Sequence, residues 1–323
     1  MNITPIPGSA MRIIENADVA AALAYPALMA ALRKMFTEGC NQPLRHHHAL
    51  DPDNSQSGML LLMPAWQADG YLGLKTLTVM PENSAKGLPS IQSVYLLFDR
   101  DSGTPLALMA AEELTSRRTA AASALAATYL ARKSAEKMLI VGAGAMAPCL
   151  IRAHATGRRL TDIAVWNHNE EKAERLAATL KAEGLPVRAA LDIEAAAGEA
   201  DIISTATLSS APLIRGDWLK PGAHLDLVGA FTPAMRESDD QAVLRASLFV
   251  DTRTGGLNEA GDIIQPLKAG LIDESDIRAD LYDLCRGTHP GRTSEDEITL
   301  FKSTGAALED LAAAILAFEA NRA

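Results

Sequence analysis

Cysteine is scarce in this sequence: three residues in 323, isolated from one another. They exclude a disulfide framework and a cysteine-rich zinc site, and they are typical of a reducing compartment. A net charge of −10 without a basic stripe argues against a nucleic-acid partner. No apolar run reaches membrane-spanning length, and the first residues lack the charged-then-apolar order of a signal peptide. We therefore expect a cytoplasmic protein with no nucleic-acid partner and no membrane partner.

The most informative segment is 138–147, with the sequence MLIVGAGAMA. Its first four residues are apolar and predict a buried parallel strand, which runs directly into Gly142 and Gly144. In a dinucleotide site the first glycine allows a tight turn, and the second lets the backbone approach a pyrophosphate at a helix N-terminus. The segment therefore predicts a phosphate-binding loop that includes Ala145 and Met146.

After this loop the pattern alternates between strands and helices, which is typical of a doubly wound parallel sheet. Strands are predicted over 162–166, 187–190, 201–205, 224–228 and 248–251, and helices over 170–183 and 192–200. Ligands of such sheets bind beyond the carboxyl ends of the strands. The cofactor-binding candidates at those ends are Asn167, His168, Asn169, Thr205, Ala206, Thr207, Val228 and Gly229.

The residues before the loop follow a different pattern. Helical periodicity predicts a helix over 19–36 that ends at Gly39. Strands are predicted over 59–63, 71–79, 91–98 and 105–109, with a hairpin turn at 101–103, and helices over 112–133 and 304–320. Successive strands without intervening helices predict an antiparallel sheet, so the fold class is α/β with a second, α+β part.

The residue after the second parallel strand bears on the choice of cofactor. NAD-preferring sites usually place Asp or Glu about 20 residues beyond the glycines, bonded to the ribose 2′-hydroxyl. The uncharged Asn167 stands there instead, so nothing repels a 2′-phosphate, although no arginine is present to bind one bidentately. We expect NADPH, with NADH tolerated.

Across nearly its whole length the sequence resembles the ornithine cyclodeaminase/mu-crystallin family. The resemblance is carried by GLK at 73–75, LPSIQ at 88–92, RTAAASA at 118–124, GAG at 142–144, ADII at 200–203, PGAH at 221–224 and RESDD at 236–240. It implies a substrate-binding and dimerisation domain at 1–125, completed by the C-terminal helix at 303–323. It also implies a Rossmann dinucleotide-binding domain at 126–302, and a homodimer.

One departure from the family pattern concerns Phe231. Ornithine cyclodeaminases carry an aspartate at the matching position, which engages the amino group of their substrate. A phenyl ring can neither accept a proton nor pair with an ammonium. The charged side-chain amine of a diamino acid would therefore be desolvated without a partner. With GAFTPAMRE at 229–237 and TLFKS at 299–303, the chain is most similar to bacterial Δ1-pyrroline-2-carboxylate reductases of the family. The resemblance therefore implies NAD(P)H-dependent reduction of cyclic α-imino acids, from Δ1-pyrroline-2-carboxylate to L-proline and from Δ1-piperideine-2-carboxylate to L-pipecolate.

The resemblance also implies the substrate residues. Arg45, Lys75 and Arg118 match the family's carboxylate-binding positions. The planar forks of the two arginines suit a carboxylate, whereas Lys75 either binds it too or donates a proton to the imine nitrogen. Thr232 is a further candidate for contacting that nitrogen. Spacing alone does not distinguish Arg118 from its neighbour Arg117.

Three consecutive histidines, His46 to His48, raise the question of a metal site. Consecutive extended residues point to alternate faces, and no nearby Cys or acidic cluster completes tetrahedral ligation, so we expect no metal. Three alternative functions remain open. They are an ornithine cyclodeaminase, an alanine dehydrogenase-like amino-acid oxidoreductase, and a non-catalytic protein that binds NADPH or a small ligand.

Overall fold

The computed structural model describes residues 11–51 and 58–322. The chain divides into two compact units, Met1–Arg118 with Ala307–Ala323 and Thr119–Ala306. The division falls within helix α3 (Ala111–Leu130), the same helix that contains the expected boundary at 125/126. In the described ranges no single helix is long and apolar enough to cross a membrane. Only the helices Asn16–Ala22 and Tyr25–Glu38, taken together, pass that test, and they are bent by 79° relative to each other.

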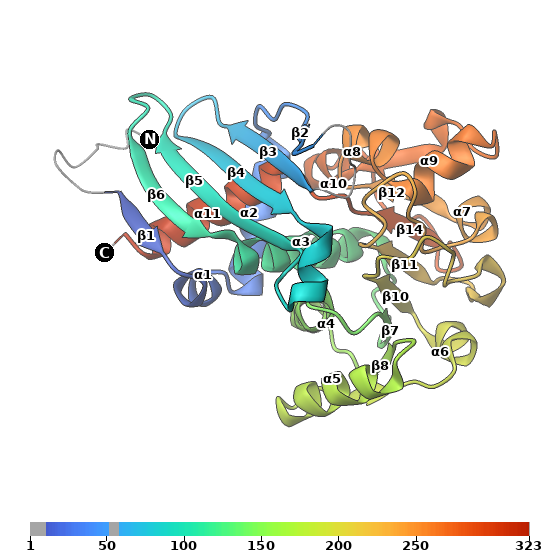
Figure 1. Cartoon of the computed structure of the whole chain (residues 1–323). Coiled ribbons are helices and arrows are strands. Elements are labelled where there is room, and N and C mark those ends of the chain that lie inside the picture. Colours follow the sequence, from blue (N-terminus) through green and yellow to red (C-terminus); the bar gives the residue numbers. More distant parts are fainter. Residues whose placement is uncertain (1–10, 52–57, 323) are drawn as a thin grey trace. The chain divides into compact units, whose positions relative to one another are not determined.

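The first unit is built on a six-stranded sheet with the order β1-β6-β5-β4-β3-β2 (Figure 1). Its strands are β1 (Arg12–Ile14), β2 (His46–Ala49), β3 (Met59–Trp66), β4 (Tyr71–Val79), β5 (Ile91–Asp99) and β6 (Pro105–Ala110). From β2 to β6 all neighbours are antiparallel, which confirms the predicted sheet. The short β1, which the pattern did not predict, pairs parallel with β6.

Two helices, α1 (Asn16–Ala22) and α2 (Tyr25–Glu38), occupy the region where one helix was expected over 19–36. The prediction of a single helix was wrong because Pro26 lies in the first turn of α2. A proline lacks the backbone N–H that continues a helix, but it is tolerated where a helix begins. Gly39 ends α2 with a φ of 81°, as its position predicted.

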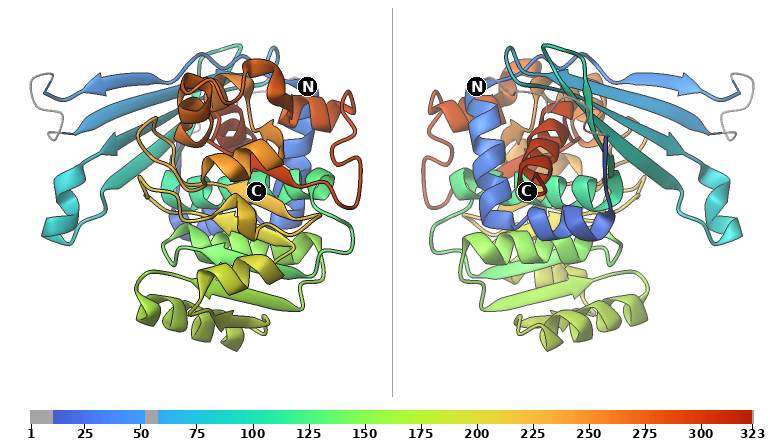
Figure 2. Two further views of the ribbon diagram at one scale, coloured as in Figure 1. Left: turned by 90° about the vertical axis from the view of Figure 1, so that its right-hand side faces the viewer. Right: turned by 90° about the vertical axis from the view of Figure 1, so that its left-hand side faces the viewer.

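The inner face of this sheet is covered by α11 (Ala307–Ala320), which packs against β3, β4 and α2. Figure 2 shows α2 and α11 side by side. Alternate strand residues point toward these helices because the side-chain period of a strand is two. The buried row comprises Leu61, Met63, Lys75, Tyr95, Leu97 and Met109. A lysine in such a row requires a charged partner nearby.

The second unit contains eight parallel strands in the order β13-β12-β14-β11-β10-β7-β8-β9, which confirms the doubly wound sheet. They are β7 (Lys137–Val141), β8 (Asp162–Trp166), β9 (Val187–Ala189), β10 (Ile202–Thr205), β11 (His224–Leu227), β12 (Ser247–Val250), β13 (Ile277–Asp280) and β14 (Thr299–Lys302). The pattern did not predict β13 or β14. The last strand in sequence, β14, lies between β11 and β12.

Helices cover this sheet, so most of its strand residues are buried and form near-continuous apolar runs. They are α4 (Met146–Gly157), α5 (Glu170–Ala182), α6 (Ile193–Glu199), α7 (Asp240–Arg245), α8 (Arg253–Asn258), α9 (Gly261–Lys268) and α10 (Leu281–Arg286). Short 3-10 helices lie at Pro81–Lys86 in the first unit and at Gly216–Trp218 and Glu274–Asp276 in the second.

Candidate active site

The loop between β7 and α4 is shaped by its two glycines. Gly142 has a φ of 106°, and a Cβ there would lie 2.9 Å from the carbonyl oxygen of Ala206, so a larger residue would be strained. A Cβ on Gly144 would meet nothing within 4 Å, so the backbone faces open space there. Helix α4 begins at Met146, and the N–H groups of its first turn are the donors that a pyrophosphate needs. The loop fits a dinucleotide.

A pocket of about 500 Å³ lies at the carboxyl ends of β7, β8 and β10, where Rossmann folds bind dinucleotides. Six of the expected cofactor residues line it: Gly142, Gly144, Asn167, His168, Ala206 and Thr207. The other lining residues are Ala143, Trp166, Lys172, Leu208, Ser209 and Leu213. The lining does not include Ala145, Met146, Asn169, Thr205, Val228 or Gly229.

The turn after β8 is held by its two asparagines. Asn167 Oδ1 accepts a hydrogen bond from the N–H of Ala143 at 3.3 Å, and Asn167 Nδ2 donates to the carbonyl of Asn169 at 3.0 Å. Asn169 caps α5 by accepting from the N–H of Lys172 at 3.1 Å. The side chains of His168 and the exposed Lys172 also line the pocket. The sequence pattern did not single out Lys172, although its place in the first turn of a predicted helix was a signal.

In the first unit, Lys75 and Arg118 form a buried ionic cluster with two carboxylates of α11. Lys75 Nζ lies 2.7 Å from Asp310 Oδ2, and Arg118 Nε donates to Asp310 Oδ1 at 2.8 Å. Arg118 Nη1 donates to Glu309 Oε2 at 2.5 Å. All four side chains are at most 4% exposed. The structure therefore brings together two of the three expected carboxylate-binding residues.

The third expected residue, Arg45, directly precedes β2 and is half-buried. Its charge acts on the cluster. Burial lowers the pKa of Lys75, the charges of Arg118 and Arg45 lower it too, and Asp310 opposes the decrease, with a resulting pKa of about 8. The three expected cations therefore interact electrostatically.

The structure distinguishes Arg118 from Arg117. Arg117 is half-buried and bonds Glu113 on its own helix at 2.6 Å, whereas Arg118 points into the cluster. Burial disfavours the charged form of Arg118, but Asp310 and Glu309 outweigh it and raise its pKa.

The sequence pattern did not predict a role for Glu309 and Asp310. The signal was present, because α11 is apolar nearly all round and such a helix is buried. Two acidic residues at the start of a buried helix require cationic partners.

The other substrate candidate, Thr232, lies in the second unit, in the loop that follows β11. Both Thr232 and its neighbour Phe231 are half-buried. Ala230 precedes them with a φ of 49°, the one positive φ of a non-glycine residue in the described ranges. The backbone thus turns sharply between the buried end of β11 and this loop.

Among residues 11–51 and 58–322, no group of three or more His, Cys, Asp or Glu side chains could hold a metal ion. The three consecutive histidines lie on β2 and are exposed. The rings of His46 and His48 contact edge to face at 6.3 Å.

The parallel sheet, the glycine loop and the pocket define a dinucleotide-binding protein of the Rossmann type, with a buried ionic cluster in its other unit. The chain belongs to the ornithine cyclodeaminase/mu-crystallin family, whose model matches residues 9–323. This finding confirms the resemblance seen in the sequence motifs.

Several characterised proteins are similar to it. A Δ1-pyrroline-2-carboxylate reductase of Paracoccus denitrificans is 42% identical, covering 79% of this chain and 81% of the relative. The Δ1-pyrroline-2-carboxylate reductase of Thermococcus litoralis, solved with NADH and L-proline, is 34% identical with a TM-score of 0.92, covering 97% and 98% of the two chains. An archaeal alanine dehydrogenase dimer with bound NAD is 28% identical with a TM-score of 0.90, covering 97% and 96%.

Proposed function

We propose that this protein is an NAD(P)H-dependent reductase of cyclic α-imino acids, an oxidoreductase acting on CH–NH bonds. Its substrates are Δ1-pyrroline-2-carboxylate, which gives L-proline, and Δ1-piperideine-2-carboxylate, which gives L-pipecolate. The observation that carries the proposal is the buried cluster of Lys75, Arg118 and Asp310, in a family member whose relatives include reductases of this kind. The Thermococcus relative, solved with NADH and L-proline, supports the same reaction.

The substrate carboxylate binds to the cationic cluster. The positive charges of Arg45, Lys75 and Arg118, which act on one another, attract this negatively charged group. Arg118 donates hydrogen bonds through Nε to Asp310 and through Nη1 to Glu309. A guanidinium has further N–H groups that can bind a ligand. Binding the acid group holds the imine carbon in one position. Fixing the reacting atoms in this way increases the rate of the reaction.

Lys75 donates the proton that the reaction needs. Its pKa of about 8 lies close to neutrality, as is favourable for a general acid, and Asp310 holds its ammonium in place. When bound, the reduced nicotinamide supplies a hydride to the imine carbon. The C=N bond becomes CH–NH, with the nitrogen taking its proton from Lys75 Nζ. Water then returns a proton to the neutral amine of Lys75.

Phe231 and Thr232 contact the ring. The phenyl group supplies apolar area for the ring methylenes, and the Thr232 hydroxyl contacts the ring nitrogen. A phenylalanine at this position leaves the side-chain ammonium of ornithine without a partner, which disfavours a cyclodeaminase.

The cofactor binds in the pocket of the second unit, with its pyrophosphate on Gly142–Met146. The rest of the cofactor would be held by residues at the neighbouring strand ends, namely Thr205, Ala206, Thr207, Val228 and Gly229. His168 and the cationic Lys172 face a 2′-phosphate, which favours NADPH while NADH is tolerated.

We also propose a homodimer that forms through the outer face of the six-stranded sheet. Residues on this face remain half-buried or exposed in the single chain and are largely apolar; they include Ile13, Leu60, Leu62, Leu72, Leu74, Val94, Leu96, Phe98 and Leu108. An apolar sheet face of this kind is typical of an interaction surface. The archaeal alanine dehydrogenase with the same fold is a dimer. The three cysteines, none of which forms a disulfide, support a cytoplasmic location.

The test is to follow NADPH absorbance with Δ1-pyrroline-2-carboxylate and Δ1-piperideine-2-carboxylate. Stoichiometric NADPH oxidation with formation of L-proline or L-pipecolate is expected. Ammonia release from ornithine without net oxidation would instead identify a cyclodeaminase. NAD-dependent deamination of alanine would identify an alanine dehydrogenase. Tight NADPH binding without turnover would identify a binding protein.

A further inference from the structure

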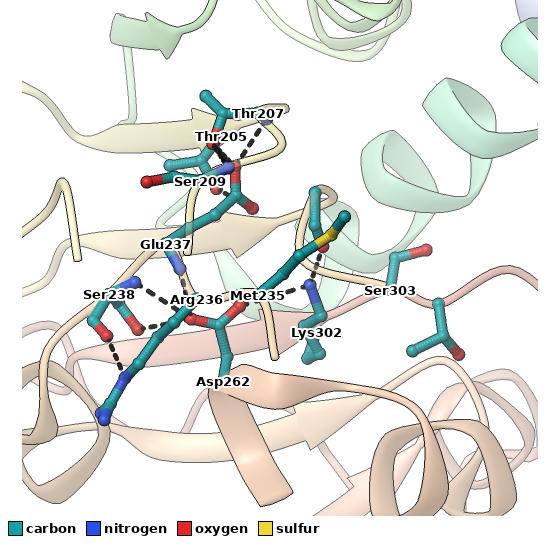
Figure 3. A network of polar contacts seen from close by, with 12 residues as sticks. Thr205, Thr207, Ser209, Met235, Arg236, Glu237, Ser238, Asp262, Lys302 and Ser303 are labelled. Carbon is teal, nitrogen blue, oxygen red and sulfur yellow. Dashed lines mark hydrogen bonds and ion pairs between the residues drawn. The ribbon is translucent and has the colours of Figure 1, made fainter. Parts of the chain in front are cut away.

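A buried polar network lies at the carboxyl ends of β10, β11 and β14, and the proposed chemistry does not use its charged side chains (Figure 3). Its charged members are Glu237, Asp262 and Lys302, each with no exposed surface. They come from the segment between β11 and α7, from α9 and from the end of β14. Three buried charges at one edge of the sheet are costly unless they hold something in place.

Glu237 holds the loop that follows β10. Its Oε1 accepts hydrogen bonds from both the N–H and the hydroxyl of Thr207 at 2.7 Å, and its Oε2 accepts from the Thr205 hydroxyl at 2.8 Å. Thr207 lines the cofactor pocket, so the Glu237 carboxylate is hydrogen-bonded to a residue of the pocket wall. The contacts fix both the backbone and the hydroxyl orientation of a residue in the pocket wall.

Lys302 and Asp262 extend the same network to the loop that follows β11. Lys302 Nζ donates to the carbonyl of Gly229 and lies 3.4 Å from Asp262 Oδ2. Asp262 Oδ1 in turn accepts from the N–H groups of Glu237 and Ser238 at 2.9 and 3.0 Å. The two strand-end loops are therefore connected through one set of buried contacts.

Gly229 shows how closely these loops approach each other. A Cβ on Gly229 would lie 2.2 Å from the carbonyl oxygen of Thr207 and 2.5 Å from Glu237 Oε1, so only glycine fits between them. The left-handed turn at Ala230 follows directly. A change in the Glu237 side chain must therefore move Thr207, Gly229 or both.

The charges in the network are not balanced, since two carboxylates face one ammonium. Burial raises the pKa of Glu237 and Asp262 raises it further, while Lys302 and the threonine hydrogen bonds oppose the increase. Removing the Glu237 carboxylate leaves the N–H of Thr207 and the hydroxyls of Thr205 and Thr207 without their acceptor. The Thr205 side chain is fully buried, so this loss favours movement of the loop.

We infer that Glu237 is a positioning residue for the nicotinamide cofactor. It acts through Thr207 on the pocket wall and, with Lys302, through Gly229 on the neighbouring loop. The inference rests on the proposed binding of a nicotinamide cofactor, but it does not depend on which imine is reduced.

The experiment compares Glu237→Ala and Glu237→Gln with the wild-type full-length protein. The Kd of NADPH is measured by quenching of tryptophan fluorescence, because Trp166 lines the pocket. Measurements are made well below each variant's Tm, with folding checked by circular dichroism. We expect Glu237→Ala to raise the Kd at least tenfold. Glu237→Gln should raise it roughly threefold, since its amide oxygen can still accept from Thr207 while its NH₂ donates to Thr205.

Asp226→Asn is the matched control. Asp226 is equally buried and accepts from Ser204 and Ser123 at 2.6 and 2.9 Å, but it lies within β11 and not at the pocket edge. We expect this variant to lower the Tm and to leave the Kd within about twofold of the wild type.

The inference is overturned if folded Glu237→Ala binds NADPH within twofold of the wild type. It is also overturned if Asp226→Asn weakens binding as much, because the effect would then follow general destabilisation. A wild-type protein that binds neither NADPH nor NADH overturns this inference and the proposed cofactor together. Wild-type binding without imine reduction contradicts only the proposed reaction.

Discussion

Lys75 Nζ lies 2.7 Å from Asp310 Oδ2, and both side chains are buried. The lysine belongs to β4 and the aspartate to the last helix, so one ion pair joins the middle of the sheet to the C-terminal segment. Removing one member of a buried pair leaves the other charged and uncompensated. The residues proposed to bind substrate therefore also attach α11 to the sheet.

Asp310→Asn should destabilise the protein strongly for this reason. Lys75 loses its carboxylate partner and Arg118 keeps only Glu309, so a loss of roughly 3–5 kcal/mol in the free energy of unfolding is expected. Urea denaturation measures it. The control is Glu199→Gln, which breaks an exposed pair with Lys137 at 3.5 Å and should cost under about 1 kcal/mol. Equal losses in the two variants would contradict a structural role for the buried pair.

Arg45→Ala and Arg118→Ala should each raise KM for the imine and lower kcat, with kcat/KM falling at least about tenfold. Each substitution removes hydrogen-bond donors to the substrate carboxylate. Steady-state kinetics at saturating NADPH measure the effect. Arg117→Ala is the matched control on the same helix, since Arg117 bonds Glu113 outside the cluster, and its kinetics should match the wild type. Unchanged kinetics in both Arg45→Ala and Arg118→Ala would require another carboxylate site.

Activity should decline as the pH rises above about 8. Burial lowers the pKa of Lys75 to about 8, and the ammonium that donates the proton is present only below that value. Above it, kcat/KM should fall by up to roughly tenfold per pH unit. Lys75→Arg should be slower but lose this alkaline limb, because arginine stays charged. A wild-type profile that is flat to pH 10 would exclude Lys75 as the proton donor.

Stability should fall at acid pH because of His224. Burial lowers its pKa to about 3, with the charge of His154 adding to the decrease, although Asp226 opposes it. The unfolded chain binds a proton near pH 6.5, whereas the folded protein does not until about pH 3. The stability present above pH 6.5 is therefore lost progressively between these values.

The matched variant for that prediction is His224→Asn, which keeps a polar atom facing Thr299, the partner of His224 Nδ1 at 2.9 Å. Thermal unfolding from pH 7.5 to 4.5 should show a shallower decline in Tm for the variant than for the wild type. Parallel declines would assign the acid sensitivity to other groups.

Lys172→Ala should weaken NADPH binding about fivefold or more and leave NADH binding unchanged, because only NADPH carries the 2′-phosphate. Fluorescence titration with both cofactors provides the comparison. Lys181→Ala, in the last turn of the same helix, serves as the charge-matched control. Equal weakening of NADPH binding and NADH binding would show that Lys172 does not contact the 2′-phosphate.

Much of the second unit could be predicted from local pattern. The glycine loop at 142–144 and the strand at 162–166 were located correctly, because tight turns and buried parallel strands impose their composition on a few adjacent residues. The break between α1 and α2 was missed although Pro26 marks it, since the apolar periodicity continues across the break.

The short strand β14 shows what local pattern does not contain. Its residues are compatible with several places in the sheet, and only packing inserts it between β11 and β12, which carries Lys302 to Gly229. Strand order in a parallel sheet depends on long crossovers, so neighbours in space are distant in sequence.

The cationic residues illustrate the same division. The family resemblance selected Lys75 and Arg118, because their positions match its carboxylate-binding motifs, whereas spacing alone did not distinguish Arg118 from Arg117. Their pairing with Asp310 arises only when α11 folds back onto the sheet. The pKa of Lys75 depends on that pairing, since the energy of a buried charge depends on distance and desolvation, which are set only in the folded protein.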